Sequence, residues 1–153
     1  MAIAANSLAP WIPIRNFDLE RLFKVINLKP GEVFYELGSG DGRVCLYAGK
    51  HYKNMIIGLE LAIPMFLISK FRNKYKNVVF KNANIFSTNL TEANVVYVYG
   101  LPRVISSRLK AKLEKDLKPG SRVISYAFII DGWKPVKIQK EQDKLPIFVY
   151  EIS

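Results

Sequence analysis

The sequence predicts an α/β fold built on a mostly parallel sheet, and three observations support this prediction. Short apolar runs alternate with segments of helical periodicity along most of the chain. Some of these runs, such as 55–59, are apolar almost throughout, which is typical of strands covered on both faces. The chain closes with two strand-like runs and no helix between them, which indicates an antiparallel hairpin at one edge of the sheet.

The length and composition indicate one globular domain over residues 1–153. A chain of 153 residues fits one domain and buries enough surface to fold without disulfides. With one cysteine, Cys45, and one histidine, His51, neither a disulfide nor a metal site is expected. No apolar run approaches the ~20 residues that span a bilayer, and the opening residues lack a basic flank. A cytoplasmic protein is therefore expected.

The net charge is strongly positive. Lysine and arginine number 23 against 13 acids, which gives a formal charge of +10 at pH 7. Such a charge favours acidic partners, namely RNA, acidic protein surfaces or membrane headgroups. The alternative is a solvated surface, because the lysines are scattered and no block of like charges occurs. Nucleic acid therefore stays among the partners to consider.

The first part of the chain divides into an arm and a helix. Two prolines exclude a helix near the start, so residues 1–16 are expected to form an extended arm. Residues 17–28 carry an apolar stripe at helical spacing, and Asn16 or Asp18 is expected to cap this helix. A Lys-Pro-Gly turn at 29–31 ends it.

A glycine-rich turn follows the first strand and is the stretch around which the chain is organised. The strand at 32–37 ends in an acid, Glu36, and runs into a turn with glycine at every second position, at Gly38, Gly40 and Gly42. Glycines let the backbone turn sharply and approach a ligand closely. A dinucleotide fingerprint is disfavoured because Arg43 stands where its third glycine is needed, so a nicotinamide dehydrogenase is the weakest candidate, and no P-loop run occurs. A plain tight turn is the alternative.

The middle of the chain continues the alternation of strands and helices. The second strand again ends in an acid, Glu60, which is placed to bind a ribose diol. Asn84 follows the third strand and is expected either to read an adenine edge or to hold a turn. The predicted elements are helices at 42–52 and 63–75 and strands at 55–60 and 78–80.

Aromatic side chains lie at or after the ends of the later strands, at Tyr99, Tyr126 and Trp133. Open α/β sheets place ligands at the carboxyl ends of their strands, so these side chains are candidates for a substrate pocket. Packing in the core or the hairpin is the alternative for each of them. The predicted elements are a strand at 94–99, a helix at 103–117, a strand at 122–130 and hairpin strands at 136–140 and 147–152.

Four features in order resemble the Rossmann-like fold of class I S-adenosylmethionine (SAM) dependent methyltransferases. They are the E-x-G-x-G-x-G turn, the acid ending the second strand, the asparagine after the third strand and the terminal hairpin. The stretches 10–13, 35–43 and 117–133 more closely resemble the small protein-lysine methyltransferases of the archaeal and mitochondrial type. The resemblance implies a mostly parallel seven-stranded sheet with a C-terminal antiparallel hairpin and helices on both faces. It also implies transfer of a methyl group from SAM to protein lysines, which leaves S-adenosyl-L-homocysteine.

The resemblance further implies which residues bind the cofactor. Trp11 and Pro13 would fold over it as a lid. Glu60 would contact the ribose, and Asn84 with Ile85 the adenine. The glycine turn would hold the methionine part through Glu36, Gly38, Ser39, Gly40 and Gly42.

Two positions depart from the pattern of this group. Ile14 stands where a threonine is usual, and Ala127 stands where an acid usually follows the serine of the fifth strand. A SAM-binding protein without turnover therefore remains an alternative. An RNA methyltransferase of another branch is a second alternative, supported by the positive charge. The run Tyr-Gly-Leu-Pro at 99–102 argues against the branches that methylate amides or adenine N6.

Overall fold

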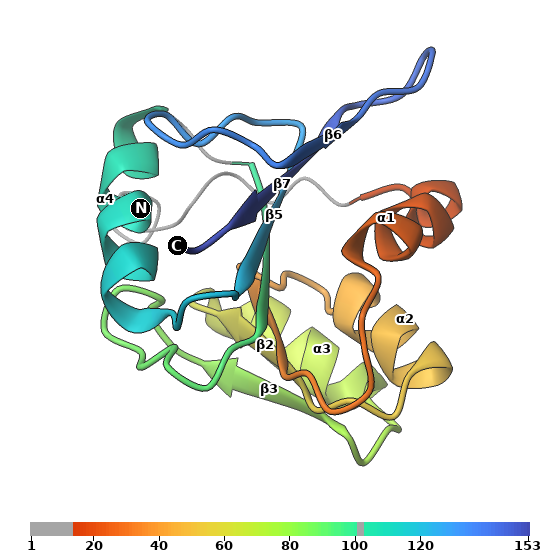
Figure 1. The fold of residues 1–153 in the computed structure, drawn as a ribbon. Coiled ribbons are helices and arrows are strands. Elements are labelled where there is room, and N and C mark those ends of the chain that lie inside the picture. Colours follow the sequence, from red (N-terminus) through yellow and green to blue (C-terminus); the bar gives the residue numbers. More distant parts are fainter. Residues whose placement is uncertain (1–13, 101–102) are drawn as a thin grey trace.

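The structure is a computed structural model that describes residues 14–100 and 103–153. Its centre is one seven-stranded sheet with the order β3-β2-β1-β4-β5-β7-β6 (Figure 1). The strands from β3 to β5 run parallel, and β7 is antiparallel to both of its neighbours. The predicted mostly parallel sheet with a C-terminal antiparallel hairpin is therefore confirmed.

The elements follow one another as the sequence predicts, mostly with shorter bounds, whereas β3 extends two residues beyond the predicted 78–80. The strands are β1 (Phe34–Leu37), β2 (Ile56–Glu60), β3 (Val78–Asn82), β4 (Val95–Tyr99), β5 (Arg122–Tyr126), β6 (Lys137–Gln139) and β7 (Ile147–Glu151). The helices are α1 (Leu19–Ile26), α2 (Arg43–His51), α3 (Ile63–Arg72) and α4 (Arg103–Asp116), and a 3-10 turn, η2 (Asn16–Asp18), precedes α1. Within the described ranges, no helix combines the length and the apolar character that crossing a bilayer requires.

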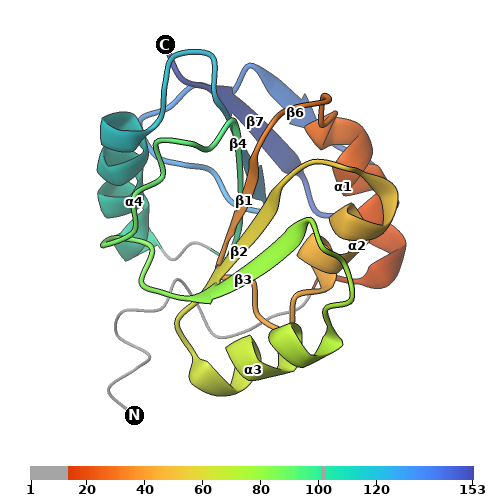
Figure 2. The same cartoon turned by 90° about the horizontal axis from the view of Figure 1, so that it is seen from below.

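The sheet separates two apolar cores. Alternate residues of each strand point to opposite faces, as the pleat requires. Phe34 and Val95 belong to the core on the side of α1 and α2, whereas Tyr35 and Val96 belong to the core beneath α4. Figure 2 shows α1, α2 and α3 on one side of the sheet and α4 on the other. Helices therefore cover both faces, as predicted.

The fifth strand ends earlier than predicted. The expectation of a strand from 122 to 130 is wrong, because β5 ends at Tyr126. The next residue, Ala127, has a φ of 73°, which leaves the extended region of backbone conformations. Ser125 Oγ donates a hydrogen bond to the carbonyl of Phe128 at 2.5 Å, which holds the chain in this turn.

The predicted helix cap is also wrong. Neither η2 nor α1 has a side chain bonded to its first backbone N–H groups. Asp18 does stand at the start of α1, but its carboxylate accepts hydrogen bonds from Arg21 and Tyr126 instead. A cap requires a free carboxylate, and here a guanidinium and a phenol compete for it successfully because all three groups are buried.

Candidate active site

The glycine turn lies at the carboxyl end of β1, where it is held against the end of β2. Gly38, Gly40 and Gly42 have φ values of 80°, 55° and 84°, which are in the left-handed region that glycine tolerates best. The N–H groups of Gly38 and Ser39 donate to the carbonyl of Leu59 at 2.8 and 2.9 Å. The turn is thereby fixed over the edge of the sheet at which α/β folds bind ligands.

Glu60 braces the same turn from the end of β2. Its Oε2 accepts a hydrogen bond from the N–H of Gly40 at 2.8 Å, and its Oε1 accepts one from the N–H of Ala62 at 2.9 Å. Asn82 Nδ2 donates to the carbonyls of Glu60 and Leu61 at 2.9 and 3.0 Å, which fixes the backbone that carries this acid. Each carboxylate oxygen has a second lone pair, so Glu60 can also accept hydrogen bonds from a diol.

Gly42 is required by packing. A Cβ at this position would lie 2.6 Å from Phe80 Cζ and 2.9 Å from Ser69 Cβ. These side chains come from β3 and α3, so the third glycine lets the start of α2 approach both elements. The family resemblance assigned Gly42 to cofactor binding. The close packing against Phe80 and Ser69 is by itself sufficient to require a glycine here.

Gly42→Ala is expected to lower the free energy of unfolding by about 2–4 kcal/mol. About 1 kcal/mol comes from the left-handed backbone, and about 1–3 kcal/mol from overpacking against Phe80. Gly31→Ala is the matched control, because Gly31 has the same φ of 84° and nothing within 4 Å of an added Cβ. Urea unfolding measures both losses, and equal losses would contradict the packing argument.

Asp41 ties the turn to α3 and to the beginning of the described chain. Arg43 Nη2 and Arg72 Nη1 each lie 2.9 Å from Asp41 Oδ2. Burial raises the pKa of Asp41, but the hydrogen bonds from Arg43 outweigh it, so the pKa lies below its ordinary value. Arg43 Nη1 also donates to the carbonyl of Ile14 at 3.0 Å, so the end of the arm meets the turn. The two predicted lid residues lie outside the described residues: Trp11 and Pro13.

Glu36 is a buried carboxyl group at the end of β1. It is 5% exposed, and Cys45 Sγ donates a hydrogen bond to its Oε2 at 3.0 Å. Burial raises the pKa of Glu36 to about 8, opposed in part by this hydrogen bond and reinforced by the charge of Asp41. At pH 7 most of the carboxyl is therefore protonated. A cation placed beside it would reverse this by favouring the carboxylate.

Two buried hydroxyl groups near the turn fit a polar ligand. Ser39 Oγ and Tyr97 Oη have no hydrogen-bond partner among the residues that the structure describes. Tyr97 pairs with Glu36 in the register of β1 and β4, so both side chains lie on the same face. Burial, reinforced by the charge of Glu36, raises the pKa of Tyr97, which keeps its hydroxyl protonated. A buried hydroxyl without a partner is costly, so a bound polar group would stabilise both.

Asn84 holds a turn beyond β3. Its Oδ1 accepts a hydrogen bond from the N–H of Phe86 at 2.9 Å, and its carbonyl accepts one from Thr88 Oγ1 at 2.7 Å. The next residue, Ile85, is 6% exposed and belongs to the core beneath α4. The turn alternative for Asn84 is thus present in the structure. Its Nδ2 makes no hydrogen bond within the described residues, which is compatible with an additional role toward a ligand.

The structure brings two of the three candidate pocket aromatics together. The rings of Tyr99 and Tyr126 meet edge to face, with centroids 4.9 Å apart and an angle of 85°. Tyr126 is buried, and its hydroxyl donates to Asp18. Burial, and then the hydrogen bond to Asp18, raise the pKa of Tyr126, so this phenol stays protonated and cannot act as a base. Tyr99 is half-buried and is the one of the pair that retains surface.

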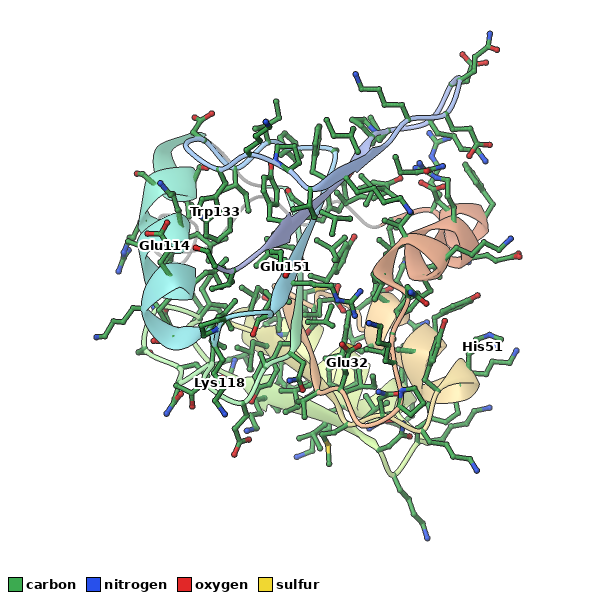
Figure 3. All side chains as sticks on the ribbon, in the orientation of Figure 1. Glu32, His51, Glu114, Lys118, Trp133 and Glu151 are labelled. Atoms are coloured by element: carbon green, nitrogen blue, oxygen red, sulfur yellow. The ribbon has the colours of Figure 1, made fainter. Side chains whose placement is uncertain are left out.

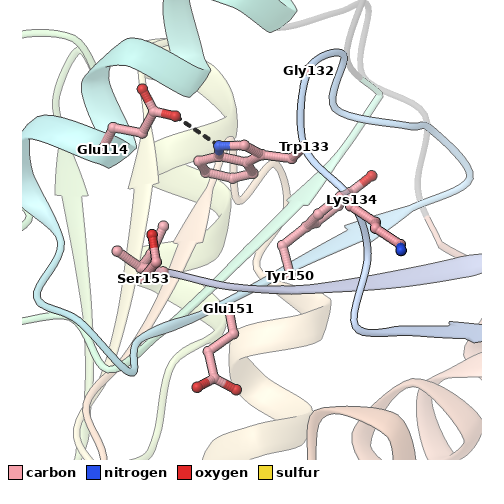
Figure 4. A pocket seen from close by; sticks show the side chains of 8 residues that line it. Glu114, Gly132, Trp133, Lys134, Tyr150, Glu151 and Ser153 are labelled. Carbon is pink, nitrogen blue, oxygen red and sulfur yellow. Dashed lines mark hydrogen bonds between the residues drawn. The ribbon is translucent and has the colours of Figure 1, made fainter.

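Trp133 lies apart from this pair, on the face of the sheet covered by α4. Its Nε1 donates to Glu114 Oε1 on α4 at 2.8 Å, and its ring packs on Tyr150 at 5.5 Å (Figure 4). Figure 3 shows Trp133 beside α4, and His51 far from it at the outer end of α2. The indole therefore performs the hairpin packing that was the alternative for it.

Sequence reasoning missed three residues of this region. Cys45 was considered for a role only in a disulfide or a metal site, but it donates to Glu36. Tyr97 was read as part of an apolar strand, and Asp18 as a cap. The strand alternation carried a signal for Tyr97, since Glu36 and Tyr97 occupy the same face once β1 and β4 pair in register.

The chain matches a family model described as the ANTKMT methyltransferase domain over residues 36–137. It is 34% identical over 140 residues to a protein-lysine N-methyltransferase of Saccharolobus islandicus, covering 88% of this chain and 86% of the relative. It is 26% identical over 136 residues to the adenine nucleotide translocase lysine N-methyltransferase of Mus musculus, covering 86% of this chain and 58% of that protein.

A solved structure supports the same fold. An RNA methyltransferase from Salinibacter ruber, in complex with S-adenosyl-L-homocysteine, superposes with a TM-score of 0.86 at 24% identity. The match covers 92% of this chain and 94% of the other. The family model covers two thirds of the chain and includes the glycine turn, the strand-end acids and β5. The protein therefore belongs to the family of ANTKMT methyltransferase domains.

Proposed function

We propose that this protein transfers the methyl group of SAM to lysine side chains of proteins. The observation that carries the proposal is the coincidence of two features. The glycine turn, with its buried acid and unpartnered hydroxyls, lies where α/β sheets bind ligands. The same chain is related over most of its length to a protein-lysine N-methyltransferase. Residues 1–153 would act as one methyltransferase domain in the cytoplasm.

Residues of three strand ends would hold the cofactor. The backbone of Gly38, Ser39 and Gly40 would lie under its methionine part, with Gly42 closing the packing behind them. Glu36 would face the amino group, whose positive charge suits a buried carboxylate. Glu60 would accept from the ribose hydroxyls, and Asn84 with Ile85 would border the adenine. Trp11 and Pro13 would cover it from the arm, which meets the turn through the Arg43 contact to Ile14.

SAM supplies a methyl group bound to a sulfonium sulfur. The amine attacks the methyl carbon in line with the bond to sulfur, and the sulfur leaves. The new bond joins the methyl carbon to the lysine Nζ while the bond from carbon to sulfur breaks, and the amine proton passes to solvent. The protein's task is to align a neutral amine and to exclude water. Tyr99, at the end of β4, is our candidate for the wall of the lysine channel, because an apolar wall keeps water from the amine and this desolvation lowers its pKa. Tyr126 would position Tyr99 from behind.

An RNA methyltransferase is the second candidate function. The net charge of +10 favours it, and the Salinibacter ruber enzyme shares the fold. The third candidate is a SAM-binding protein without turnover, since Ala127 lacks the acid usual at its position. Ala127 donates its N–H to the carbonyl of Pro146 at 2.8 Å, so the turn it forms is intact without that acid.

Incubation with SAM labelled in its methyl group and a lysate of the source organism is expected to label proteins. The label should be released by protease, resist nuclease and appear on lysine after hydrolysis. An excess of S-adenosyl-L-homocysteine should suppress it. The variant Glu36→Gln is the control for the cofactor site. Its rate of methyl transfer at limiting SAM should fall about tenfold or more, because the charged hydrogen bond between Glu36 and the amino group of SAM is lost.

The same experiment separates the candidates. Label released only by nuclease would overturn the lysine proposal in favour of RNA. Absence of label, with SAM binding retained in calorimetry, would identify a SAM-binding protein without turnover.

A further inference from the structure

Helix α3 exposes most of its apolar side chains. Ile63, Leu67 and Phe71 follow one another at intervals of four residues, so they form one stripe, and they are 58%, 55% and 91% exposed. Ile68 beside them is 44% exposed. Ser69 is the one fully buried residue of the helix. A surface helix ordinarily turns its apolar stripe toward the core, and α3 does the opposite.

The close packing beneath α3 accounts for this orientation. Ser69 is small and sits against Gly42, where even an added Cβ would come within 2.9 Å. Ser69 Oγ donates to the carbonyl of Phe66, so the hydroxyl is satisfied within the helix. The helix therefore approaches the glycine turn through its smallest residue, and Phe66 packs partly buried against the core on the side of α1 and α2. Figure 2 shows α3 along the outer side of β2 and β3, with its other side directed away from the sheet.

The sequence around this stripe is basic. Residues 61–91 contain no aspartate or glutamate, and their five cations are Lys70, Arg72, Lys74, Lys76 and Lys81. Lys70 and Lys74 lie over the rings of Phe66 and Tyr75, at 5.7 and 5.8 Å from the centroids. Their ammonium groups thus lie within cation–π distance of neighbouring rings, and both lysines remain exposed to water. An exposed apolar stripe with long cations beside it is typical of a helix that lies in a membrane interface.

We propose that α3 docks this protein on the surface of an anionic lipid membrane. The apolar stripe would enter the boundary between headgroups and acyl chains, and the lysines would meet lipid phosphates. A second copy of the chain fits less well, because it would bring two basic surfaces together. A nucleic acid would meet the cations but leave Ile63 and Leu67 without apolar partners. The inference does not depend on the proposed function.

Flotation with phospholipid vesicles tests the proposal. At low salt, the protein is expected to float with vesicles in which about a third of the phosphatidylcholine is replaced by phosphatidylglycerol. With vesicles of pure phosphatidylcholine it should stay in the bottom fraction. The double variant Leu67→Ser/Phe71→Ser should lower the partition about tenfold or more. Val136→Ser is the matched control, since Val136 is 63% exposed but lies outside α3, and its partition should equal that of the wild type. Rising salt should weaken binding.

Several results would overturn the proposal. They are absence of binding to the anionic vesicles, equal binding to neutral ones, and unchanged binding of the double variant. Loss of binding on deletion of residues 2–9 alone would assign the membrane contact to the arm. A dimer in sedimentation that the double variant dissociates would assign the stripe to a second copy. Flotation requires no methyl transfer, so its failure is distinct from failure of the proposed function.

Discussion

Glu36→Gln is expected to stabilise the protein at alkaline pH and to weaken its binding of SAM. The carboxyl group has a pKa of about 8 in the folded state against 4.5 as its ordinary value. The folded state therefore holds a proton that the unfolded state has lost between these two values, so stability falls as pH rises through this window. The loss at pH 9 is at most about 5 kcal/mol.

The amide variant has no proton to lose, so its stability should vary less with pH. Urea unfolding without cofactor at pH 5, 7 and 9 measures this for both proteins, and the two curves should diverge toward pH 9. The same substitution should weaken the binding of SAM. An amide cannot neutralise the cofactor's amino group, and loss of a charge-assisted hydrogen bond corresponds to about a 10- to 100-fold weaker Kd in calorimetry.

The variant Cys45→Ala tests separately whether the pKa of Glu36 sets the pH dependence of stability. The thiol hydrogen bond lowers the pKa of Glu36, so removing it should raise that pKa further. The variant should start from a lower stability, because it leaves a small cavity. Its alkaline loss should also be larger and continue to a higher pH, because the folded pKa rises while the unfolded pKa stays the same. A wild-type stability that is flat from pH 5 to 9, or an unchanged slope in Glu36→Gln, would contradict this account of the buried acid.

The local patterns of the sequence predicted the parallel core of this protein well. The apolar strands have only one favourable environment, which is a sheet covered on both faces. Glycine at every second position after β1 predicted a sharp turn, and all three glycines adopt left-handed φ values there. These signals are short-range, so they can be read without knowing which distant segments meet.

Features set by distant contacts were beyond the same reasoning. Asp18 looked like a cap because a cap depends only on neighbours. Its carboxylate is instead shared between Arg21, three residues on, and Tyr126, which is 108 positions away. The helix at 63–75 was predicted, but its orientation was not: Ser69 packs against Gly42, and most of the apolar side chains of α3 face outward. Strand β5 ends at the left-handed conformation of Ala127. Alanine rarely adopts a positive φ, so its presence in the sequence does not predict such a turn. The predicted roles of the cofactor residues stay predictions.

Asp18→Ala is expected to be the most damaging of the single substitutions at the edge of the candidate substrate pocket. Asp18 and Arg21 are 2% and 8% exposed. Arg21 Nε and Nη2 donate to the two oxygens of Asp18 at 2.6 and 2.8 Å, and Nη2 also donates to the carbonyl of Leu145 at 2.7 Å. The substitution would leave a buried guanidinium without its carboxylate, at a cost of about 3–5 kcal/mol. The Tm should fall by about 10 °C.

The pH dependence of this cluster has the opposite sign to that of Glu36. The hydrogen bond from Arg21 is the main reason that the pKa of Asp18 lies below its ordinary value of 3.8. The unfolded state therefore binds a proton first as pH falls, so the stabilisation is complete above about pH 5 and is lost as pH falls through the folded pKa. Asp18→Ala should consequently lose less stability than the wild type on acidification to pH 3.

Two controls separate the buried pair from ion pairs in general. Glu20→Ala breaks a pair with Lys24 at 3.0 Å on the same helix, but both side chains are more than 70% exposed. Its effect should be far smaller than that of Asp18→Ala, because water screens an exposed ion pair. The double variant Asp18→Leu/Arg21→Met removes both charges and should recover most of the loss, because no uncompensated charge remains. A loss below about 1 kcal/mol in Asp18→Ala, or no recovery in the double variant, would contradict the argument.

The same cluster decides whether Tyr126 has a role beyond packing. Tyr126→Phe removes only its hydrogen bond to Asp18, which should cost about 1.5–3 kcal/mol because the acceptor is charged. If Tyr126 positions Tyr99 beside the lysine, the variant should raise the KM for the protein substrate at a temperature where it is fully folded, while the KM for SAM stays unchanged. Equal kinetic constants at that temperature would limit Tyr126 to holding α1 against β5. The rings of Tyr126 and Tyr99 lie 4.9 Å apart between centroids, so buried Tyr126 contacts the half-buried Tyr99 at the sheet edge directly. This contact favours the positioning role.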